Sequence, residues 1–540
     1  MTAAGSVGQS PARAVSRRAW VALALLLALG CAIRSYRISE PIGGYHAYNE
    51  AWYSIVARNY VAGTLLEPRI YEVGIDFRTP PLYSYLVYFA EPLVGDFVLA
   101  ARWVSVVSSL VAMVFVFLIA NAAWGAPSGL FAASLFGFAP IAVTVGRNAQ
   151  TDMTYVAFLL GTIYFYLLSR EREGLRYAAL TGAFFAASFF TKYFAVLLPP
   201  TLLVWELLHG HRRWIDRRLA VAFGVFVVLV APYFVYHLTT SFDVFLEQQF
   251  AGAVNVTRFD PSWDTLKRIS LNVFFGISPV YCCIFAPAGV YVLWRADTTA
   301  SLFALGFVAY FALYFLNDNH SYYLLTQLPF LALVAGRALA AIPAGRFSNV
   351  LLGLLVVNGA VASVLFLASA KYGWEVIEDL VDAATRRSPN PVILLEQSLA
   401  DSNGPVFKYY CPGCDLVVKE SLPRNAERID IDYDRSVVVI KDDLRGARDG
   451  YEIVSHDSLC INLFGTGVIT KRPNRHFFGG AITRVKIQTG VPFGISPCSR
   501  TAAKAFRRLP PDAVLSTTRG RIFEVTTDAQ GRRSSARRVE

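Results

Sequence analysis

Residues 45–53 read "YHAYNEAWY", which sets one histidine and one glutamate among four aromatic side chains. The stretch follows the apolar run 19–36 closely, and an ionisable group beside a membrane segment is a candidate for chemistry. Glu50 could serve as a general base, with His46 and Tyr48 beside it against a substrate. The structural alternative is that Asn49 caps a short helix whose positive N-terminal end favours the Glu50 carboxylate.

Three further groups of polar side chains interrupt apolar sequence. Arg147 and Asp152 both lie in "GRNAQTD", and Lys192 is the one charged residue of "FFTKYF". A lysine ammonium there suits a phosphate ligand. The third group, in "NDNHSYY", comprises His320, Tyr322 and Tyr323. Each group has a structural alternative, namely an Arg147–Asp152 ion pair, a lysine that reaches toward the lipid headgroups and an interfacial aromatic belt.

Arg78 lies in "DFRTPPLY", where Pro80 and Pro81 restrict the backbone and so fix the direction of the arginine. Together with Lys192 and Arg58 it offers several cations for one anionic group. Phosphate is the anion that such a set of cations typically binds. The sequence therefore predicts a phosphate site bordered by the carboxylates Glu50 and Asp152.

The elements that must position these groups are membrane helices. The chain has 540 residues, of which 55% are hydrophobic and 16% charged, with a mean hydropathy of +0.43. Soluble domains average about 25% charged residues. The net charge of +11 is not gathered into one face or tail, which argues against nucleic acid as a partner. We expect a polytopic α-helical membrane protein.

Apolar runs predict about eleven transmembrane helices. They lie near 19–36, 98–121, 128–145, 153–169, 177–191, 193–208, 219–237, 269–294, 300–316, 322–341 and 347–369. Arginine-rich loops alternate with loops of fewer positive charges, so segment 1–18 is expected in the cytoplasm. An uncleaved first helix is favoured over a signal peptide, because no small-x-small cleavage site follows Ala32.

This orientation puts the large first loop, about 37–97, and the C-terminal part of the chain on the exoplasmic side of the cell membrane. Within the C-terminal part, short β-rich runs alternate with Gly, Pro, Asn and Asp. We expect a transmembrane domain over 19–369, a small exoplasmic α/β domain over 370–520 and a flexible basic tail over 521–540.

Four cysteines lie in the polar C-terminal third, namely Cys411, Cys414, Cys460 and Cys498. An exoplasmic location favours one or two disulfides among them. Pairing Cys411 with Cys414 and Cys460 with Cys498 is one of three arrangements. A Cys₄ zinc site and free thiols are the alternatives.

The ordered motifs resemble those of the GT-C fold, and more closely those of the dolichyl-phosphate-mannose–protein mannosyltransferase and aminoarabinose transferase superfamily. The resemblance covers about residues 17–345 and rests on an acidic group after the first span, "PPL", the Arg-to-Asp loop, "TK" and "HSYYLLTQLPFLALVAG". Such enzymes transfer a sugar from a polyprenyl phosphate carrier to a hydroxyl acceptor on the outer face, with inversion. Lipid, protein and cell-envelope glycan all remain open as the acceptor.

The resemblance implies roles for the residues already named. The family usually carries Asp-Glu in the first loop, whereas this chain has Asn49-Glu50, so Glu50 is the candidate base and Asp152 matches the second acidic position. Arg78 and Lys192 match the phosphate-binding positions, with Arg58 as a further cation. Tyr48, His46, Arg147, His320, Tyr322 and Tyr323 are candidate substrate contacts. Some relatives bind a divalent metal, for which Glu50, Asp152 and His320 offer ligands.

Two other classes of protein fit parts of the pattern. A transporter or flippase for a lipid-linked saccharide should place polar groups at the membrane midplane and break several helices. A membrane scaffold with a binding domain would leave Glu50 and Lys192 without a role. The polar candidates cluster at the outer edge of the predicted spans, which favours an enzyme. The sugar, the acceptor and the oligomeric state are not encoded in recognisable motifs.

Overall fold

The computed structural model describes most of the chain up to residue 369 and separate parts of the remainder. The described residues are 15–42, 47–60, 65–70, 74–77, 79–172, 174–209, 216–248, 276–312, 321–343, 345–369, 392–419, 437–440, 460–463, 466–470, 482–487, 493–496, 522–527 and 533–539, with isolated positions between 263 and 273 and between 378 and 385. They fall into two units. The first is drawn from Met1–Ile38, Thr64–Pro68 and Ile75–Phe366, and the second from Ser39–Gly63, Arg69–Gly74 and Leu367–Glu540.

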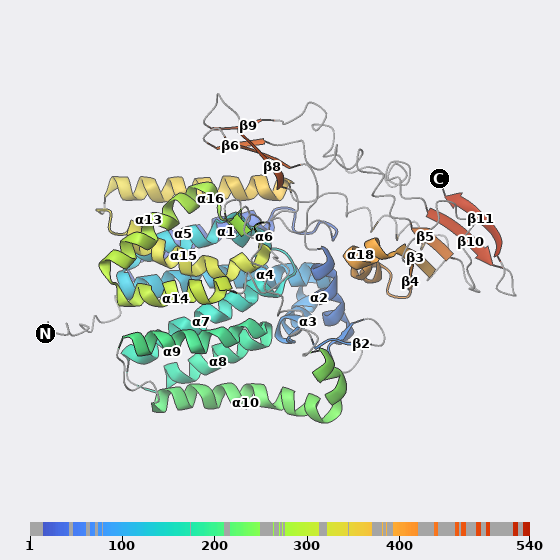
Figure 1. Cartoon of the computed structure of the whole chain (residues 1–540), viewed down its shortest axis with the longest axis horizontal. Helices are drawn as coiled ribbons and strands as arrows, with labels where there is room; N and C mark the ends of the chain where they lie inside the picture. Colours follow the sequence, from blue (N-terminus) through green and yellow to red (C-terminus); the bar gives the residue numbers. More distant parts are fainter. Residues whose placement is uncertain are drawn as a thin grey trace. The chain divides into compact units, whose positions relative to one another are not determined.

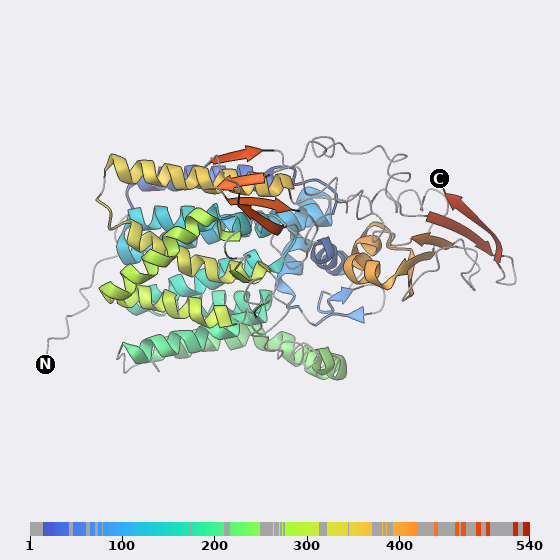
Figure 2. The same cartoon turned by 45° about the horizontal axis from the view of Figure 1, so that its top comes forward.

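The first unit is a bundle of apolar helices whose long members run side by side (Figures 1 and 2). In chain order they are α1 (Arg17–Ser35), α3 (Leu82–Val94), α4 (Phe97–Trp124), α5 (Ala126–Gly137), α6 (Pro140–Val145), α7 (Thr151–Glu171), α8 (Arg176–Thr191), α9 (Leu198–Leu208), α10 (Arg217–Thr240), α13 (Pro279–Arg295), α14 (Thr298–Ala312), α15 (Leu324–Leu339) and α16 (Arg346–Ser369). The 3-10 turns η2 (Tyr193–Leu197) and η4 (Ser321–Tyr323) precede α9 and α15.

Among the described residues, five helices are long and apolar enough to cross a membrane. They are Arg17–Ser35, Phe97–Trp124, Thr151–Glu171, Arg217–Thr240 and the Arg346–Val364 part of α16. Five shorter apolar helical segments of 10–17 residues accompany them. The chain is therefore a multi-pass, mostly helical membrane protein, and each apolar run in the sequence contains helix.

One predicted span, 128–145, is broken in the structure into α5 and α6. Pro140 opens α6, and the residue before a proline is sterically biased away from the α region. Ala139 accordingly adopts an extended conformation with φ −63° and ψ 133°. The expectation of one continuous helix there is wrong, because continuous hydropathy hides the break.

Small residues let neighbouring helices of the bundle approach closely, as is common in membranes. At Gly161 of α7, an added Cβ would lie 2.2 Å from the ring of Phe184 in α8. At Gly182 of α8, it would lie 2.2 Å from the backbone oxygen of Ala222 in α10. These contacts set the spacing of α7, α8 and α10, which carry or flank the polar groups discussed below.

The second unit combines a first-loop helix with C-terminal elements. Helix α2 (Ala47–Asn59) packs against α18 (Gln397–Tyr410). Helix α18 joins two parallel strands, β3 (Val392–Glu396) and β4 (Asp415–Lys419), in a βαβ arrangement. A short hairpin of β1 (Arg69–Ile70) and β2 (Gly74–Ile75) lies between α2 and α3 in the sequence.

Two sheets are described in the C-terminal part. The first has the order β11-β10-β5-β3-β4, with β5 (Val437–Ile440), β10 (Ile522–Thr527) and β11 (Arg533–Val539). The second is antiparallel with the order β8-β7-β6-β9, formed by Ile482–Ile487, Thr466–Thr470, Cys460–Leu463 and Phe493–Ser496. Strands β10 and β11 lie where the sequence predicts a flexible tail, and they pair because "IFEVTT" has a strand-forming composition.

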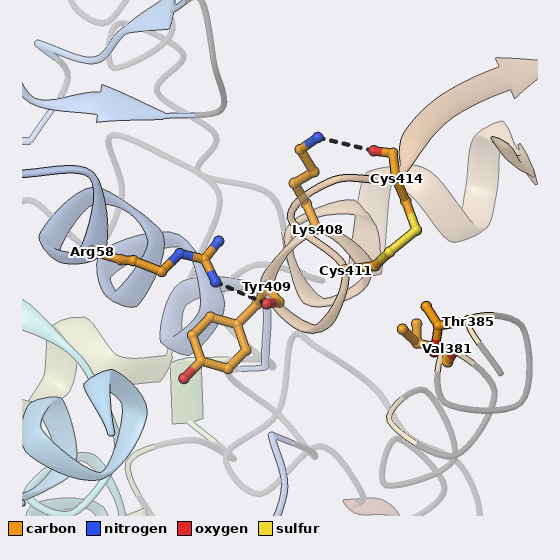
Figure 3. The surroundings of a disulfide bond; sticks show 7 residues. All are labelled: Arg58, Val381, Thr385, Lys408, Tyr409, Cys411 and Cys414. Atoms are coloured by element: carbon orange, nitrogen blue, oxygen red, sulfur yellow. Dashed lines mark hydrogen bonds between the residues drawn. A yellow bond between two sulfur atoms is a disulfide. The ribbon is translucent and has the colours of Figure 1, made fainter. Parts of the chain in front are cut away.

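A disulfide joins Cys411 and Cys414 directly after α18 (Figure 3). Both cysteines are buried. Cys460 begins strand β6, and Cys498 lies outside the described residues, so a Cys460–Cys498 pairing remains a prediction. Cys31, Cys282 and Cys283 are free thiols.

Candidate functional site

Asp152 and Lys192 form a partly buried ion pair in the first unit. Lys192 Nζ lies 2.6 Å from Asp152 Oδ1, and the two side chains are 17% and 5% exposed. Asp152 is in the first turn of α7, where the helix dipole favours a carboxylate. Lys192 directly follows α8 in an extended conformation, with φ −158° and ψ 126°. The ends of two neighbouring helices thus bring opposite charges into contact.

Three aromatic rings surround the Lys192 ammonium. Nζ lies 5.2 Å from the ring centroid of Phe194, 5.1 Å from that of Tyr322 and 5.0 Å from that of Tyr323. Such distances are typical of cation–π contacts. Phe194 comes from η2, and the two tyrosines come from η4 at the start of α15. Segments α7, η2 and η4 therefore all contact the Lys192 ammonium. The structure brings together four of the residues predicted from the sequence, namely Asp152, Lys192, Tyr322 and Tyr323.

Arg147 has backbone partners in the structure. Its Nε donates to the carbonyl of Arg34 at 3.0 Å, and its Nη2 donates to that of Tyr36 at 2.5 Å. These carbonyls lie at the end of α1, where an arginine satisfies acceptors that have no helical partner. Asp152 pairs with Lys192, so the Arg147–Asp152 ion pair considered from the sequence is not the arrangement formed.

Arg34 is a buried arginine that the sequence reasoning missed. Its guanidinium donates to the carbonyls of Gly30, Gly137 and Ala142 at 3.1, 2.8 and 3.3 Å. It thereby ties α1 to the end of α5 and to α6. A charged residue inside the first apolar run was the available signal, since such residues mark either function or internal packing.

Glu50 and Tyr48 lie in α2 of the second unit. The Glu50 side chain is buried, in the first turn of α2, and its carbonyl accepts from Ser54 Oγ at 2.7 Å. Ala47 and Tyr48 are already helical, so Asn49 lies inside α2 and the expectation that Asn49 is the N-cap is wrong. Tyr48 stacks on Trp52 with ring centroids 5.5 Å apart.

Arg58, at the last turn of α2, contacts the end of α18. Its Nη1 donates to the Tyr409 carbonyl at 3.0 Å, and its guanidinium lies 5.2 Å from the centroid of the Tyr409 ring (Figure 3). Burial lowers the pKa of the Arg58 guanidinium below its usual value.

His46, Arg78 and His320 lie outside the described residues, but both neighbours of Arg78 are described. The Phe77 N–H donates to Gln248 Oε1 at 2.6 Å, and Thr79 Oγ1 donates to Asp76 Oδ2 at 3.1 Å. The backbone is thus fixed directly before Arg78 by a residue 171 positions further along the chain than Phe77. Neither Gln248 nor Asp76 was singled out from the sequence, although Asp76 stands in the same "DFRTPPLY" motif.

A pocket of about 410 Å³ opens near these segments within the first unit. Its lining includes Pro81, Phe190, Pro232 and Tyr233. Pro81 lies three residues after Arg78, and Phe190 lies two residues before Lys192. An apolar pocket therefore adjoins both segments that carry the predicted phosphate ligands.

The described residues contain no group of three or more histidine, cysteine, aspartate or glutamate side chains arranged to hold a metal ion. Of the candidate ligands, Asp152 is engaged by the Lys192 ammonium, Glu50 belongs to the other unit and His320 is outside the described part. The positive charge and the N–H donors of Lys192 beside Asp152 favour binding of an anion over binding of a metal cation.

Comparisons with known proteins support the relationship suggested by the motifs. Residues 78–236, which include Asp152 and Lys192, match the family model described as dolichyl-phosphate-mannose-protein mannosyltransferase. The undecaprenyl phosphate-alpha-4-amino-4-deoxy-L-arabinose arabinosyl transferase 2 of Pseudomonas fluorescens (strain Pf0-1) is 24% identical over 220 residues. This match covers 39% of the chain and 40% of the relative, which is less than half the length of each.

Similar solved structures extend the likeness over most of the chain. ArnT from Cupriavidus metallidurans in the apo state has a TM-score of 0.62 at 14% identity, and the same protein bound to undecaprenyl phosphate has a TM-score of 0.61 at 14% identity. Each match covers 80% of this chain and 95% of the other. The Archaeoglobus fulgidus oligosaccharyltransferase, in complex with Zn and sulfate, reaches 0.55 at 10% identity and covers 83% of this chain and 72% of its own. At such identities the likeness concerns the fold.

Proposed function

We propose that this chain is a glycosyltransferase of the GT-C fold, which transfers a sugar from a polyprenyl-phosphate carrier to a hydroxyl acceptor on the outer face of the membrane and inverts the anomeric centre. The support for the carrier is chemical. A cation held at the end of a membrane helix beside an apolar pocket matches a ligand with one anionic head and a long hydrocarbon tail. A solved structural relative was crystallised with undecaprenyl phosphate.

The Asp152–Lys192 pair is the observation that carries the proposal. Removing charges from water is costly, so a half-buried lysine needs compensating groups. Lys192 has one carboxylate and three aromatic rings around it. This arrangement fixes the ammonium in a position where it stabilises negative charge without reorganisation, which is the most effective form of electrostatic catalysis.

In the proposed reaction, the acceptor oxygen attacks the anomeric carbon while the bond from that carbon to the phosphate oxygen breaks. Lys192 and Arg78 stabilise the charge that develops on the departing phosphate. Glu50 takes the proton of the acceptor hydroxyl, and Asp152 orients Lys192 and helps to hold the acceptor. A single displacement inverts the anomeric centre and needs no glycosyl-enzyme intermediate.

The remaining predicted contacts fit around this core. Tyr322 and Tyr323 border Lys192 and are proposed to contact the donor head. The 410 Å³ pocket beside Pro81 and Phe190 would take the first isoprene units of the carrier. Tyr48, His46 and His320 are proposed contacts to the sugar or the acceptor. Arg147 and Arg58 have backbone partners, so we assign both to positioning.

We further propose eleven spans, a cytoplasmic N-terminus and an exoplasmic C-terminal α/β domain. Asp152, in the first turn of α7, and Lys192, which follows α8, lie at the same end of this helix pair. The opposite end carries Arg170, Arg172 and Arg176. Arginine enrichment at one end of a helix pair marks the cytoplasmic side, so the ion pair belongs to the outer side.

The direct test incubates the purified full-length protein with a panel of polyprenyl-phosphate sugars and measures release of polyprenyl phosphate. We expect release from at least one donor, with a rate that depends on the hydroxyl acceptor supplied. Absence of release from every donor would contradict the proposal. Movement of intact donor across a liposome membrane without cleavage would instead identify a flippase.

A further inference from the structure

Two consecutive tyrosines at the end of α18 hold the two ends of the α2 region. The Tyr409 carbonyl accepts from Arg58 Nη1 at 3.0 Å, and Arg58 is in the last turn of α2 (Figure 3). The Tyr410 hydroxyl accepts from the backbone N–H of Ile42 at 2.7 Å, ahead of α2. These contacts join residues separated by 351 and 368 positions in the sequence.

The contact of Arg58 suits the C-terminal end of a helix. The last carbonyls of α18 have no partners within the helix, and the negative end of its dipole favours a cation. Arg58 also lies over the Tyr409 ring, with its guanidinium carbon 5.2 Å from the centroid. The same arginine therefore satisfies a backbone acceptor, a dipole and an aromatic face, all belonging to α18.

The Cys411–Cys414 disulfide braces this end of α18. The N–H of Cys411 donates to the Phe407 carbonyl at 2.9 Å. Lys408 Nζ donates to the Cys414 carbonyl at 2.9 Å (Figure 3). Both cysteines are buried, at 3% and 0% exposure. The covalent turn thus begins one residue after the two tyrosines that contact the α2 region, and it restricts the backbone from which they extend.

We propose that Arg58 is a positioning residue that, together with Tyr410 and the Cys411–Cys414 disulfide, fixes the helix that presents Glu50. The inference rests on the proposed function of Glu50 as the base. Glu50 precedes Arg58 by eight residues, or about two turns of one rigid helix, so loosening the end of α2 moves the carboxylate as well. The C-terminal part of the chain then acts on catalysis without contacting the substrate.

The disulfide makes this positioning depend on oxidation. Reduction by a dithiol such as dithiothreitol transfers two electrons and two protons to the Cys411–Cys414 bond, which yields two cysteine thiols and the cyclic disulfide of the reductant. The turn after α18 is then no longer covalently closed. We expect the oxidised form of the protein to be the more active one.

The test compares backbone hydrogen exchange of residues 47–59 in the purified full-length protein and its variants. Arg58→Ala and the double variant Cys411→Ser/Cys414→Ser should raise exchange in α2 at least tenfold, whereas Arg58→Lys, which keeps one donor and the charge, should give an intermediate value. Tyr410→Phe removes only the hydroxyl and is the mildest variant. Cys283→Ser changes an exposed free cysteine and is the matched control, with wild-type exchange expected.

Kinetics with an active donor separate positioning from binding. The proposal predicts that kcat falls in Arg58→Ala while the KM of the donor stays within about twofold, since the reacting carboxylate and not the phosphate site is displaced. Unchanged exchange in α2 in both Arg58→Ala and the double cysteine variant would overturn it. A raised donor KM with intact α2 protection would instead make Arg58 a phosphate ligand. Failure of every donor refutes the proposed function, while the exchange data still decide the positioning.

Discussion

The position of Lys192 is set by the end of α8. The helix stops at Thr191, and the extended conformation of the next residue directs the ammonium to Asp152 of α7. Removing one partner of a buried ion pair typically costs about 3–5 kcal/mol, because the remaining charge is left without compensation. The pair is 17% and 5% exposed, so solvent screening reduces this cost. It thus contributes to local order as well as to the proposed chemistry.

Glu50→Gln is the substitution that tests the proposed base. Loss of a positioned general base lowers rates by roughly 10²–10⁴-fold, and we expect a fall in kcat within that range. The amide keeps the size of the side chain, so α2 should stay folded. Glu171→Gln makes the same change at an exposed position at the end of α7 and serves as the control.

The pH profile of kcat distinguishes a base from a structural carboxylate. If Glu50 accepts the proton, the wild type loses activity as the pH falls and the carboxylate protonates. That acidic limb should vanish in Glu50→Gln. A variant that keeps both wild-type kcat and the acidic limb would rule Glu50 out as the base.

Individual residues were predictable from the sequence to different degrees. Asp152 and Lys192 stand out because charged groups beside membrane spans are costly and need a reason. The ion pair between Asp152 and Lys192 could not be predicted, because it depends on where α7 begins and where α8 ends. Arg147 is closer to Asp152 in the sequence and was the partner considered for it. Arg147 instead satisfies carbonyls at the end of α1, a contact between residues more than 100 positions apart.

At the scale of elements, the packing of α7, α8 and α10 depends on glycines. An added Cβ at Gly182 would lie 2.2 Å from the backbone oxygen of Ala222, which cannot yield without moving α10. We expect Gly182→Ala to destabilise the bundle by about 1–3 kcal/mol, the usual cost of overpacking. Thermal unfolding of the purified protein in one detergent measures the effect.

Gly224→Ala is the matched control for this prediction. It makes the same change in α10, where an added Cβ meets nothing within 4 Å. Alanine is also the better helix former, so this variant should melt at or slightly above the wild-type temperature. Equal melting temperatures for the two variants would show that the α8–α10 contact does not limit stability.

Hydropathy predicted where the helices lie but not how they end. Long apolar runs give the membrane helices because only internal hydrogen bonding satisfies the backbone in lipid. The break at Pro140 depends on local backbone geometry, to which an averaged apolar signal is insensitive. A short helix near Asn49 was nevertheless one interpretation of the first loop, and the structure has α2 there.

For the whole molecule, the proposed topology has one orientation in the membrane, with the N-terminus in the cytoplasm and the C-terminus outside. A tag at the C-terminus should be accessible to a membrane-impermeant reagent in sealed right-side-out vesicles, and a tag at the N-terminus should not. The physical reason is the arginine bias of alternate loops. The reverse labelling pattern would place the Asp152–Lys192 pair on the cytoplasmic face and exclude the proposed side of reaction.

The grouping of the first loop with the C-terminal part was not predictable from one sequence. The contacts of α2 with α18 join segments more than 300 residues apart, and no sequence motif in either segment indicates this contact. Cys411 and Cys414 were predicted as disulfide candidates because an exoplasmic location favours disulfides. A four-residue disulfide loop removes only about 2 kcal/mol of chain entropy, so its importance lies in what it holds in place.

Single-turnover kinetics can decide whether the site around Lys192 performs glycosyl transfer. Purified wild type, Lys192→Met, Lys192→Arg and the exposed-charge control Arg346→Met are mixed with a labelled polyprenyl-phosphate sugar and acceptor, and polyprenyl phosphate is followed with time. We predict release by wild type and the control, a loss of about 10²–10³-fold in Lys192→Met and a smaller loss in Lys192→Arg. Release by Lys192→Met at the wild-type rate would contradict the account.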